Sequence, residues 1–172
     1  MMKKIKKWLI IPIICILMIC IGTKIIYTEQ DAWNELLALD SSITMEDLTQ
    51  EGYIDVSEVM SSENKEILSF FAKIEKGHSE VLRVANIIDG KLCAKILFYN
   101  TSINVIKMWT IYPNQQQAED PGKCFSVEIY EVETDGVINV FLKHVPDATS
   151  PTAEKDIYVD EKLYSYLDNN KK

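Results

Sequence analysis

The first feature of the chain is a long run of apolar side chains near its start. Residues 8–22 read WLIIPIICILMICIG, and the 20 residues from Trp8 to Tyr27 carry one charge, Lys24. At a rise of about 1.5 Å per residue, a helix of that length spans roughly 30 Å, the hydrocarbon thickness of a bilayer. The pattern predicts a transmembrane helix over residues 8–27, with membrane lipid as its partner.

Charges on the two sides of this run predict its orientation. Four lysines lie within residues 3–7, and acidic residues follow at 29, 31 and 35. Lysine-rich flanks stay on the cytoplasmic side of a membrane. We therefore expect a single-pass protein of the cell membrane, with a cytoplasmic N-terminus and an extracellular C-terminal domain.

Two other export signals compete for the same region. A cleaved signal peptide shares the lysine-rich start and the short apolar run, and its best cleavage triplet is Cys20-Ile21-Gly22. A lipoprotein signal needs a small residue before its cysteine, whereas isoleucine precedes both Cys15 and Cys20. Under each alternative the rest of the chain is exported.

Apolar positions recur at helical spacing in two later segments. Residues 28–51 predict a helical stalk, in which Thr44–Asp47 resembles a capping box. The stronger pattern runs from Glu63 to Lys76, with Ser62 as the expected N-cap and Gly77 as the left-handed stop. One well-formed amphipathic helix therefore precedes the strands.

From residue 81 the period of the pattern changes to two, which predicts strands. Asp-Gly pairs at 89–90 and 135–136 are strong signals for two-residue hairpin turns. The five expected strands are Val81–Ile88, Lys91–Tyr99, Ile103–Tyr112, Lys123–Glu133 and Val137–Val145. A linker at 146–152 and a last helix over Asp160–Asp168 complete the pattern.

These elements predict an α+β fold: an N-terminal transmembrane helix, then one amphipathic helix packed on an antiparallel sheet of about five strands. The expected divisions are a lysine-rich cytoplasmic tip and anchor at 1–27, a helical stalk at 28–51, an α+β domain at 52–145, and a linker with a C-terminal helix at 146–172.

The first hairpin turn also fixes which side chains share a face of the sheet. A two-residue loop at 89–90 places Arg83 opposite Ile96, on an apolar face that we expect the helix 63–76 to cover. The other face of this hairpin should be wetter, and it holds Val84, Asn86, Cys93 and Lys95.

Residues 52–145 contain an opening GYIDV, a helix ending in Gly as FFAKIEKG, the strand VLRVANI, and DGKLCAKILFY with its turn and final Tyr. In these features the segment resembles a family of small exported domains of unknown function from Gram-positive bacteria. Where members of the family carry a second cysteine, this chain reads LKHVPD. The resemblance implies a helix followed by an antiparallel sheet, and it implies no catalytic residue.

Charge narrows the range of partners. The formal net charge of the chain is −8, and residues 28–172 hold 13 basic and 26 acidic side chains, a net of −13. A domain this acidic is a poor ligand for nucleic acid, whose phosphates attract Lys and Arg. We therefore expect no nucleic-acid partner.

No motif for catalysis, metal or cofactor binding is present. The chain has no Cys-x-x-Cys, no His-x-x-x-His and no phosphate-binding glycine loop. We interpret His78 as a loop residue and His144 as a residue at the end of the sheet. Neighbouring carboxylates such as Asp31 and Glu35, or Asp160 and Glu161, are interpreted as solvated surface.

Three side chains are candidates for binding. Arg83, the chain's only arginine, is either an edge residue with a solvated head or the partner of an anion, which could be a carboxylate of this protein or a ligand. Tyr130 and Phe141 should oppose each other on the second hairpin, as part of a partner surface or under the last helix.

The two cysteines outside the apolar run are expected to be thiols. Cys93 lies in the second expected strand and Cys124 at the start of the fourth, so in a meander a third strand separates them. Two strand spacings are roughly 9.6 Å, beyond the Cα separation of about 7 Å that a disulfide allows.

The sequence therefore favours a membrane-anchored extracytoplasmic domain that acts as a binding or structural module at the cell envelope. Its partner could be an envelope protein, a wall component or a second copy. An extracytoplasmic hydrolase using carboxylates is the alternative, and convergence of acidic side chains in one pocket would favour it.

Overall fold

The computed structural model describes residues 27–115, 117–145 and 159–168, with the backbone alone at 117–122. The helices are α2 (Glu29–Leu37), α3 (Met45–Gln50), α4 (Lys65–Ile74) and the 3₁₀ turn η1 (Pro113–Gln115). The strands are β1 (Ile54–Asp55), β2 (Val81–Ile88), β3 (Lys91–Asn100), β4 (Val105–Tyr112), β5 (Gln117–Thr134), β6 (Val137–His144) and β7 (Glu161–Leu167).

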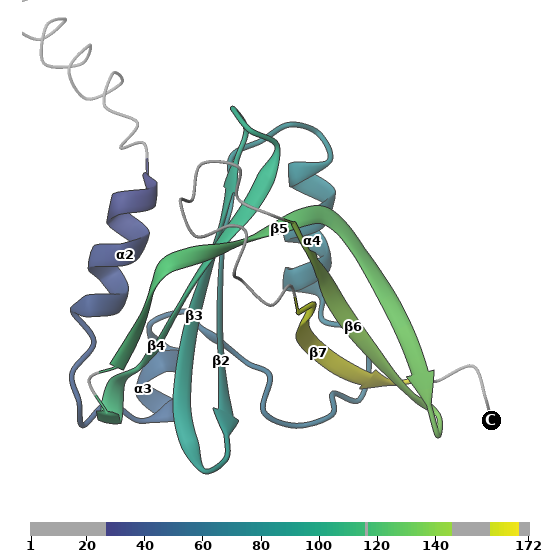
Figure 1. Cartoon of the computed structure of the whole chain (residues 1–172). Helices are drawn as coiled ribbons and strands as arrows, with labels where there is room; N and C mark the ends of the chain where they lie inside the picture. The colour runs from purple at the N-terminus through teal and green to yellow at the C-terminus, as the bar shows by residue number, and fades with distance from the viewer. Residues whose placement is uncertain (1–26, 116, 146–158, 169–172) are drawn as a thin grey trace, which may run out of the picture.

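All seven strands form one sheet in chain order (Figure 1). β1 pairs with β2 in parallel, and every other neighbouring pair is antiparallel. The sheet curls because the segment after β1 reaches its far edge: the Met60 amide donates to the Ser165 carbonyl at 2.8 Å, and the Leu167 amide to the Met60 carbonyl at 3.0 Å. Residues 54–60 thus contact both edges of the sheet.

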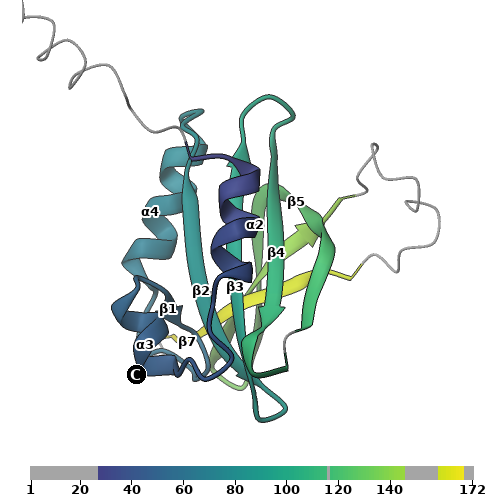
Figure 2. The same cartoon turned by 90° about the vertical axis from the view of Figure 1, so that its left-hand side faces the viewer.

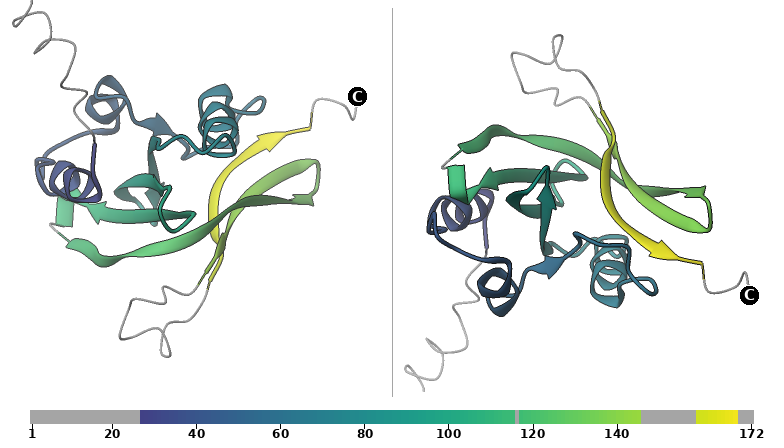
Figure 3. Two further views of the ribbon diagram at one scale, coloured as in Figure 1. Left: turned by 90° about the horizontal axis from the view of Figure 1, so that it is seen from above. Right: turned by 90° about the horizontal axis from the view of Figure 1, so that it is seen from below.

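The curled sheet has a core on each face. On the concave face α4 lies inside the curl (Figure 3), and its apolar side chains belong to one core with side chains from β2 to β7. On the convex face α2 and α3 cover β2 to β4 (Figure 2), around Leu36, Leu48, Ile96 and Trp109.

Local sequence explains where the helices begin and end. Thr28 and Thr44 each form a capping box with the Asp three residues later, which satisfies the first amides of α2 and α3. The N-cap of α4 is Asn64 and not the expected Ser62, and its side chain accepts hydrogen bonds from two amides of the first turn. Gly77, at φ +74°, ends the turn after α4 as expected.

The hairpin registers are confirmed. Arg83 pairs with Ile96, and Tyr130 with Phe141, as the Asp-Gly turns predict. The expectation about which face α4 covers is wrong. The face of Arg83 is covered by α2 and α3, whereas α4 covers the opposite face, so Val84, Cys93 and Lys95 are buried and not wet.

The expected fold class is wrong in its layers and strand number. The structure has a seven-stranded mixed sheet, curled and covered by helices on both faces, where one helix on about five antiparallel strands was expected. Residues 161–167 form β7 and not a helix, because their backbone groups pair with β6 and with Met60. β5 begins at Gln117, six residues before the expected strand start at Lys123.

The expected membrane location is also contradicted. Among residues 27–115, 117–145 and 159–168, no helix combines the length and the apolar character needed to cross a bilayer. The expected span at 8–27 lies outside these residues except for Tyr27, whose ring packs 6.4 Å from that of Phe98. The transmembrane, single-pass and extracellular assignments therefore find no support in the fold.

Candidate functional site

The aromatic pair expected on the second hairpin lies on the convex face of the sheet. Tyr130 and Phe141 stack with their ring centroids 5.3 Å apart and their planes 13° from parallel. Their neighbours Ile129, Val140 and Leu142 point the other way, into the concave core. Alternation along a strand therefore places the pair on the outer surface.

Further apolar side chains share this surface with the aromatic pair. Val132 lies two residues beyond Tyr130, and Val137 pairs across the strands with both Thr134 and Leu167. The exposed fractions are 38% for Tyr130, 43% for Val132 and 46% for Leu167. We name the surface formed by Tyr130, Val132, Val137, Phe141 and Leu167 the aromatic face.

Asp160 fixes one edge of the aromatic face. Its carboxylate accepts a hydrogen bond from the Tyr130 hydroxyl at 2.8 Å and another from the His144 backbone amide at 2.8 Å. The amide of His144, and then the Tyr130 hydroxyl, hold the pKa of Asp160 below its usual value, and the bond to Asp160 raises the pKa of Tyr130. Tyr130 is thereby held in one orientation at the surface.

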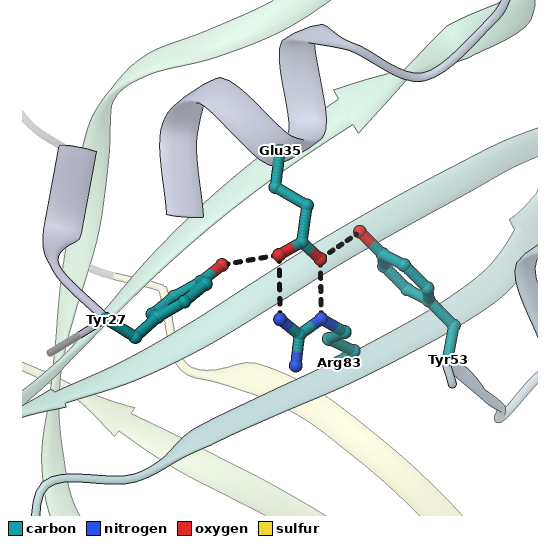
Figure 4. Close-up of polar contacts among 4 residues, drawn as sticks. All are labelled: Tyr27, Glu35, Tyr53 and Arg83. Carbon is teal, nitrogen blue, oxygen red and sulfur yellow. Dashed lines mark hydrogen bonds and ion pairs between the residues drawn. The ribbon is translucent and has the colours of Figure 1, made fainter. Parts of the chain in front are cut away.

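Arg83 binds a carboxylate of this protein. The Nε–H of its guanidinium donates a hydrogen bond to one oxygen of Glu35 at 2.5 Å, and a terminal N–H donates to the other oxygen at 2.7 Å, which makes a bidentate pair (Figure 4). Hydroxyls of Tyr27 and Tyr53 donate to the same carboxylate at 2.7 and 3.3 Å. The Arg83 guanidinium carbon lies 5.3 Å from the centroid of the Tyr27 ring, a cation–π contact.

The electrostatics of this cluster suit a structural role. Burial raises the pKa of Glu35, but the hydrogen bonds from Arg83 and Tyr27 outweigh it, so the net pKa is lowered. The bond to Glu35 in turn raises the pKa of Arg83. Because α2 carries Glu35 and β2 carries Arg83, the pair holds α2 on the sheet. The Glu35 carboxylate also occupies the two guanidinium N–H donors that an anionic ligand would bind.

Two glutamates from distant parts of the chain converge on one phenol. Glu63, just before α4, and Glu131 on β5 each lie 3.2 Å from the Tyr166 hydroxyl on β7. Both carboxylates are exposed, whereas the Tyr166 side chain is buried. A catalytic acid–base pair needs one carboxyl held in an apolar setting, and this arrangement does not supply it.

The concave face also contains a buried ion pair. The Lys95 ammonium, whose side chain is 6% exposed, lies 2.5 Å from a carboxylate oxygen of Glu161 on β7. Asn86, on the same face of the neighbouring strand, has a buried side-chain oxygen that accepts no hydrogen bond within the described part of the chain. The pair links β3 to β7 across the curl.

The two histidines lie where the sequence suggested. His78 is exposed in the loop after α4, and His144 ends β6. Within the described ranges no group of three His, Cys, Asp or Glu side chains converges as a metal site would require. Cys93 and Cys124 are buried thiols on β3 and β5, with β4 between them, which confirms the strand order behind that expectation.

Sequence reasoning missed Glu35, Glu63 and Glu131. Glu35 was interpreted as solvated because its surroundings in the sequence are polar, although α2 buries Ala32 and Leu36 on either side of it. Glu131 could have been placed on the concave face, since it alternates with Tyr130. Nothing in the sequence indicates that Glu63 meets it, because 68 residues separate the two.

Comparisons with known proteins add no relative: no family model, curated protein or solved structure matches this chain. The resemblance of residues 52–145 to small exported domains therefore stays a prediction.

Proposed function

We propose that the protein is a binding module, and that its aromatic face holds a basic protein partner with an apolar contact surface. The observation that carries the proposal is the contrast between the two halves of the convex face. Helices cover the β2–β4 half, whereas no element within the described ranges covers the aromatic face on β5–β7.

The composition of the aromatic face suits a contact with another protein. It brings together a stacked aromatic pair and three aliphatic side chains on a rigid sheet, and aromatic residues are enriched at the centres of interfaces. Tyr130 keeps its hydroxyl bonded to Asp160, so its ring needs no reordering when a partner binds. Apolar patches bordered by polar residues mark interaction sites in soluble proteins.

The net charge of this end of the molecule specifies the partner further. The described residues 126–145 and 159–168, here called the β5–β7 lobe, contain seven Asp or Glu and two Lys over both faces of the sheet, a net of 2 − 7 = −5. Electrostatic complementarity steers association and disfavours like-charged partners. A second copy would bring the same negative lobe, so a basic protein of another kind is the better occupant.

A photocrosslinking experiment on the full chain in its native cells tests the proposal. A photoreactive phenylalanine analogue replaces Val132 on the aromatic face or, as a control, Ile103, which is 54% exposed in the turn before β4. After irradiation, a crosslinked adduct of this chain with its partner should form from position 132 and not from position 103. Mass spectrometry should identify a different protein with a basic surface.

Matched substitutions show whether the aromatic face makes the contact. Leu167→Ser, at 46% exposure on the aromatic face, should cut the adduct yield, whereas Leu37→Ser, at 51% exposure at the end of α2, should not. Equal adducts from positions 132 and 103, an adduct of two copies of this chain, or a yield that Leu167→Ser leaves unchanged would each overturn the proposal.

A further inference from the structure

We propose that Glu63, Glu131, Tyr164 and Tyr166 form a site for an organic cation with N–H donors, the group that an arginine or lysine side chain presents. The site lies on the concave side of the sheet, where the entry to α4 meets β5 and β7. It is separate from the aromatic face, because Glu131 alternates with Tyr130 along β5. It therefore stands whether or not the aromatic face binds a protein.

The cluster has too few protons to give each carboxylate a hydrogen bond. The Tyr166 hydroxyl lies 3.2 Å from Glu63 and 3.2 Å from Glu131, yet a phenol has one proton and can donate to one carboxylate at a time. The carboxylate that receives no proton then faces a lone pair of the phenol oxygen. One further N–H donor between the two glutamates would remove this conflict.

The two glutamates also bring negative charges that no cation of the described residues offsets. Neither Glu63 nor Glu131 forms an ion pair with any Lys, Arg or His of the described residues. Two carboxylates whose bonded oxygens lie at most about 6.4 Å apart, twice 3.2 Å, carry two negative charges with no cation between them. A bound cation would turn this repulsion into attraction for both.

Tyr164 offers a phenol that bonds to none of the described residues. This side chain is 2% exposed, stacks on Tyr166 with the ring centroids 6.0 Å apart, and makes no hydrogen bond to any residue that the structure describes. Burial, followed by the charges of Glu63 and Glu131, raises the pKa of Tyr164 to about 12. The hydroxyl is therefore protonated at neutral pH and can also accept a bond from an incoming N–H.

The kind of ligand favours an organic cation over a metal ion. Calcium is bound by carboxylates, carbonyls and water, and no third His, Cys, Asp or Glu side chain of the described residues joins the two glutamates in one group. A guanidinium has five N–H donors and an ammonium has three, enough to bond both glutamates at once.

The probe for the test is N-acetyl-arginine amide, titrated into the full chain while the tyrosine ring signals are followed by NMR. The neutral isostere N-acetyl-citrulline amide is the control for shape, and tetramethylammonium is the control for charge without N–H donors. We expect the arginine amide to shift the Tyr164 and Tyr166 signals and both controls to leave them unchanged. N-acetyl-lysine amide, a second probe, should shift the signals less than the arginine amide.

Isosteric variants locate the site. Glu131→Gln and Glu63→Gln should each weaken binding at least about tenfold, since a hydrogen bond to a charged group is worth roughly 1.5–3 kcal/mol. Glu128→Gln is the matched control, because Glu128 is an exposed glutamate on the same strand outside the cluster. Binding that survives the double variant Glu63→Gln, Glu131→Gln, equal shifts with the citrulline amide, or tighter binding of Ca²⁺ through the same glutamates would overturn the proposal.

The thermal midpoint of unfolding gives a second readout that needs no NMR assignment. Without ligand, Glu131→Gln should raise the midpoint because it removes an uncompensated charge from the cluster. Saturating arginine amide should raise the midpoint of the wild type and leave that of the double variant unchanged. A midpoint that Glu131→Gln lowers in the absence of ligand would contradict the charge argument.

Discussion

The bidentate pair between Glu35 and Arg83 should contribute substantially to the stability of the fold. Both side chains are partly covered, at 29% and 28% exposure. Fully exposed ion pairs contribute about 0.2–1 kcal/mol, and removing one partner of a buried pair costs about 3–5 kcal/mol. At this intermediate exposure we expect Arg83→Met or Glu35→Gln to lower the free energy of unfolding by about 2 kcal/mol.

The assay is urea unfolding of the full chain, followed by tryptophan fluorescence and circular dichroism. Trp33 lies on α2 and Trp109 beneath it, so fluorescence reports whether α2 stays on the sheet. A double-mutant cycle isolates the pair, because the double variant loses less than the sum of the two single losses when the residues interact. Arg83→Lys keeps the charge without the fork and should recover only part of the loss.

The pH dependence of the same variants supplies an independent check. The pKa of Glu35 is lower in the folded protein than in the unfolded chain, so the carboxylate stabilises the fold fully above its unfolded value of about 4.3. This stabilisation is lost as the pH falls through the lower folded value. The advantage of wild type over Glu35→Gln should therefore shrink below about pH 5. A coupling energy under about 0.5 kcal/mol, or an advantage that grows in acid, would refute the reasoning.

Three further outcomes follow from other parts of the fold. Glu161→Gln leaves the Lys95 ammonium buried and unpaired, so it should lower the free energy of unfolding by about 3 kcal/mol in a urea titration, whereas Lys95→Met should cost less. Gly77→Ala should cost about 1 kcal/mol by thermal unfolding, because φ is +74° and no atom lies within 4 Å of the added methyl, so only backbone strain acts. Peptide mapping after alkylation should find Cys93 and Cys124 unmodified in the native chain and both modified in denaturant; a Cys93–Cys124 disulfide would contradict the strand order.

Turn chemistry made the hairpins predictable from sequence. Asp89 and Gly90 have positive φ values of 51° and 75°, as do Asp135 and Gly136 at 53° and 78°, which is the backbone of a two-residue hairpin loop. Once such a loop is fixed, every cross-strand pair of the first hairpin follows by counting. Arg83 opposite Ile96 needed no further knowledge of the fold.

The layers on the sheet were not predictable in the same way. Residues 92–99 are apolar at seven of eight positions, Lys95 being the exception, and such continuous runs indicate a strand buried on both faces. Because the residues on each face of this strand are apolar apart from Lys95, the pattern does not show which face a given helix covers. Which helix covers which face depends on contacts of α2 and α4 with strands far along the chain.

The C-terminal strand shows how tertiary pairing overrides a short local pattern. Leu163, Tyr164 and Leu167 have the spacing of a helix, but a helix of nine residues is marginal without tertiary support. The same residues as β7 pair with β6 and with Met60, and they bury Tyr164 and Tyr166 in the concave core. Aromatic side chains also favour strands, which the helical spacing concealed.

The way α2 lies on the sheet indicates what a partner on the aromatic face must provide. α2 packs apolar side chains against β3 and β4, and its acids Glu29 and Glu35 lie over Lys107 and Arg83 of the sheet. On this half the helix is acidic and the sheet is basic. The β5–β7 lobe as a whole is acidic, with seven carboxylates against two lysines over both faces of the sheet. A partner on the aromatic face therefore needs an apolar centre, and the net negative charge of the lobe attracts a partner of net positive charge.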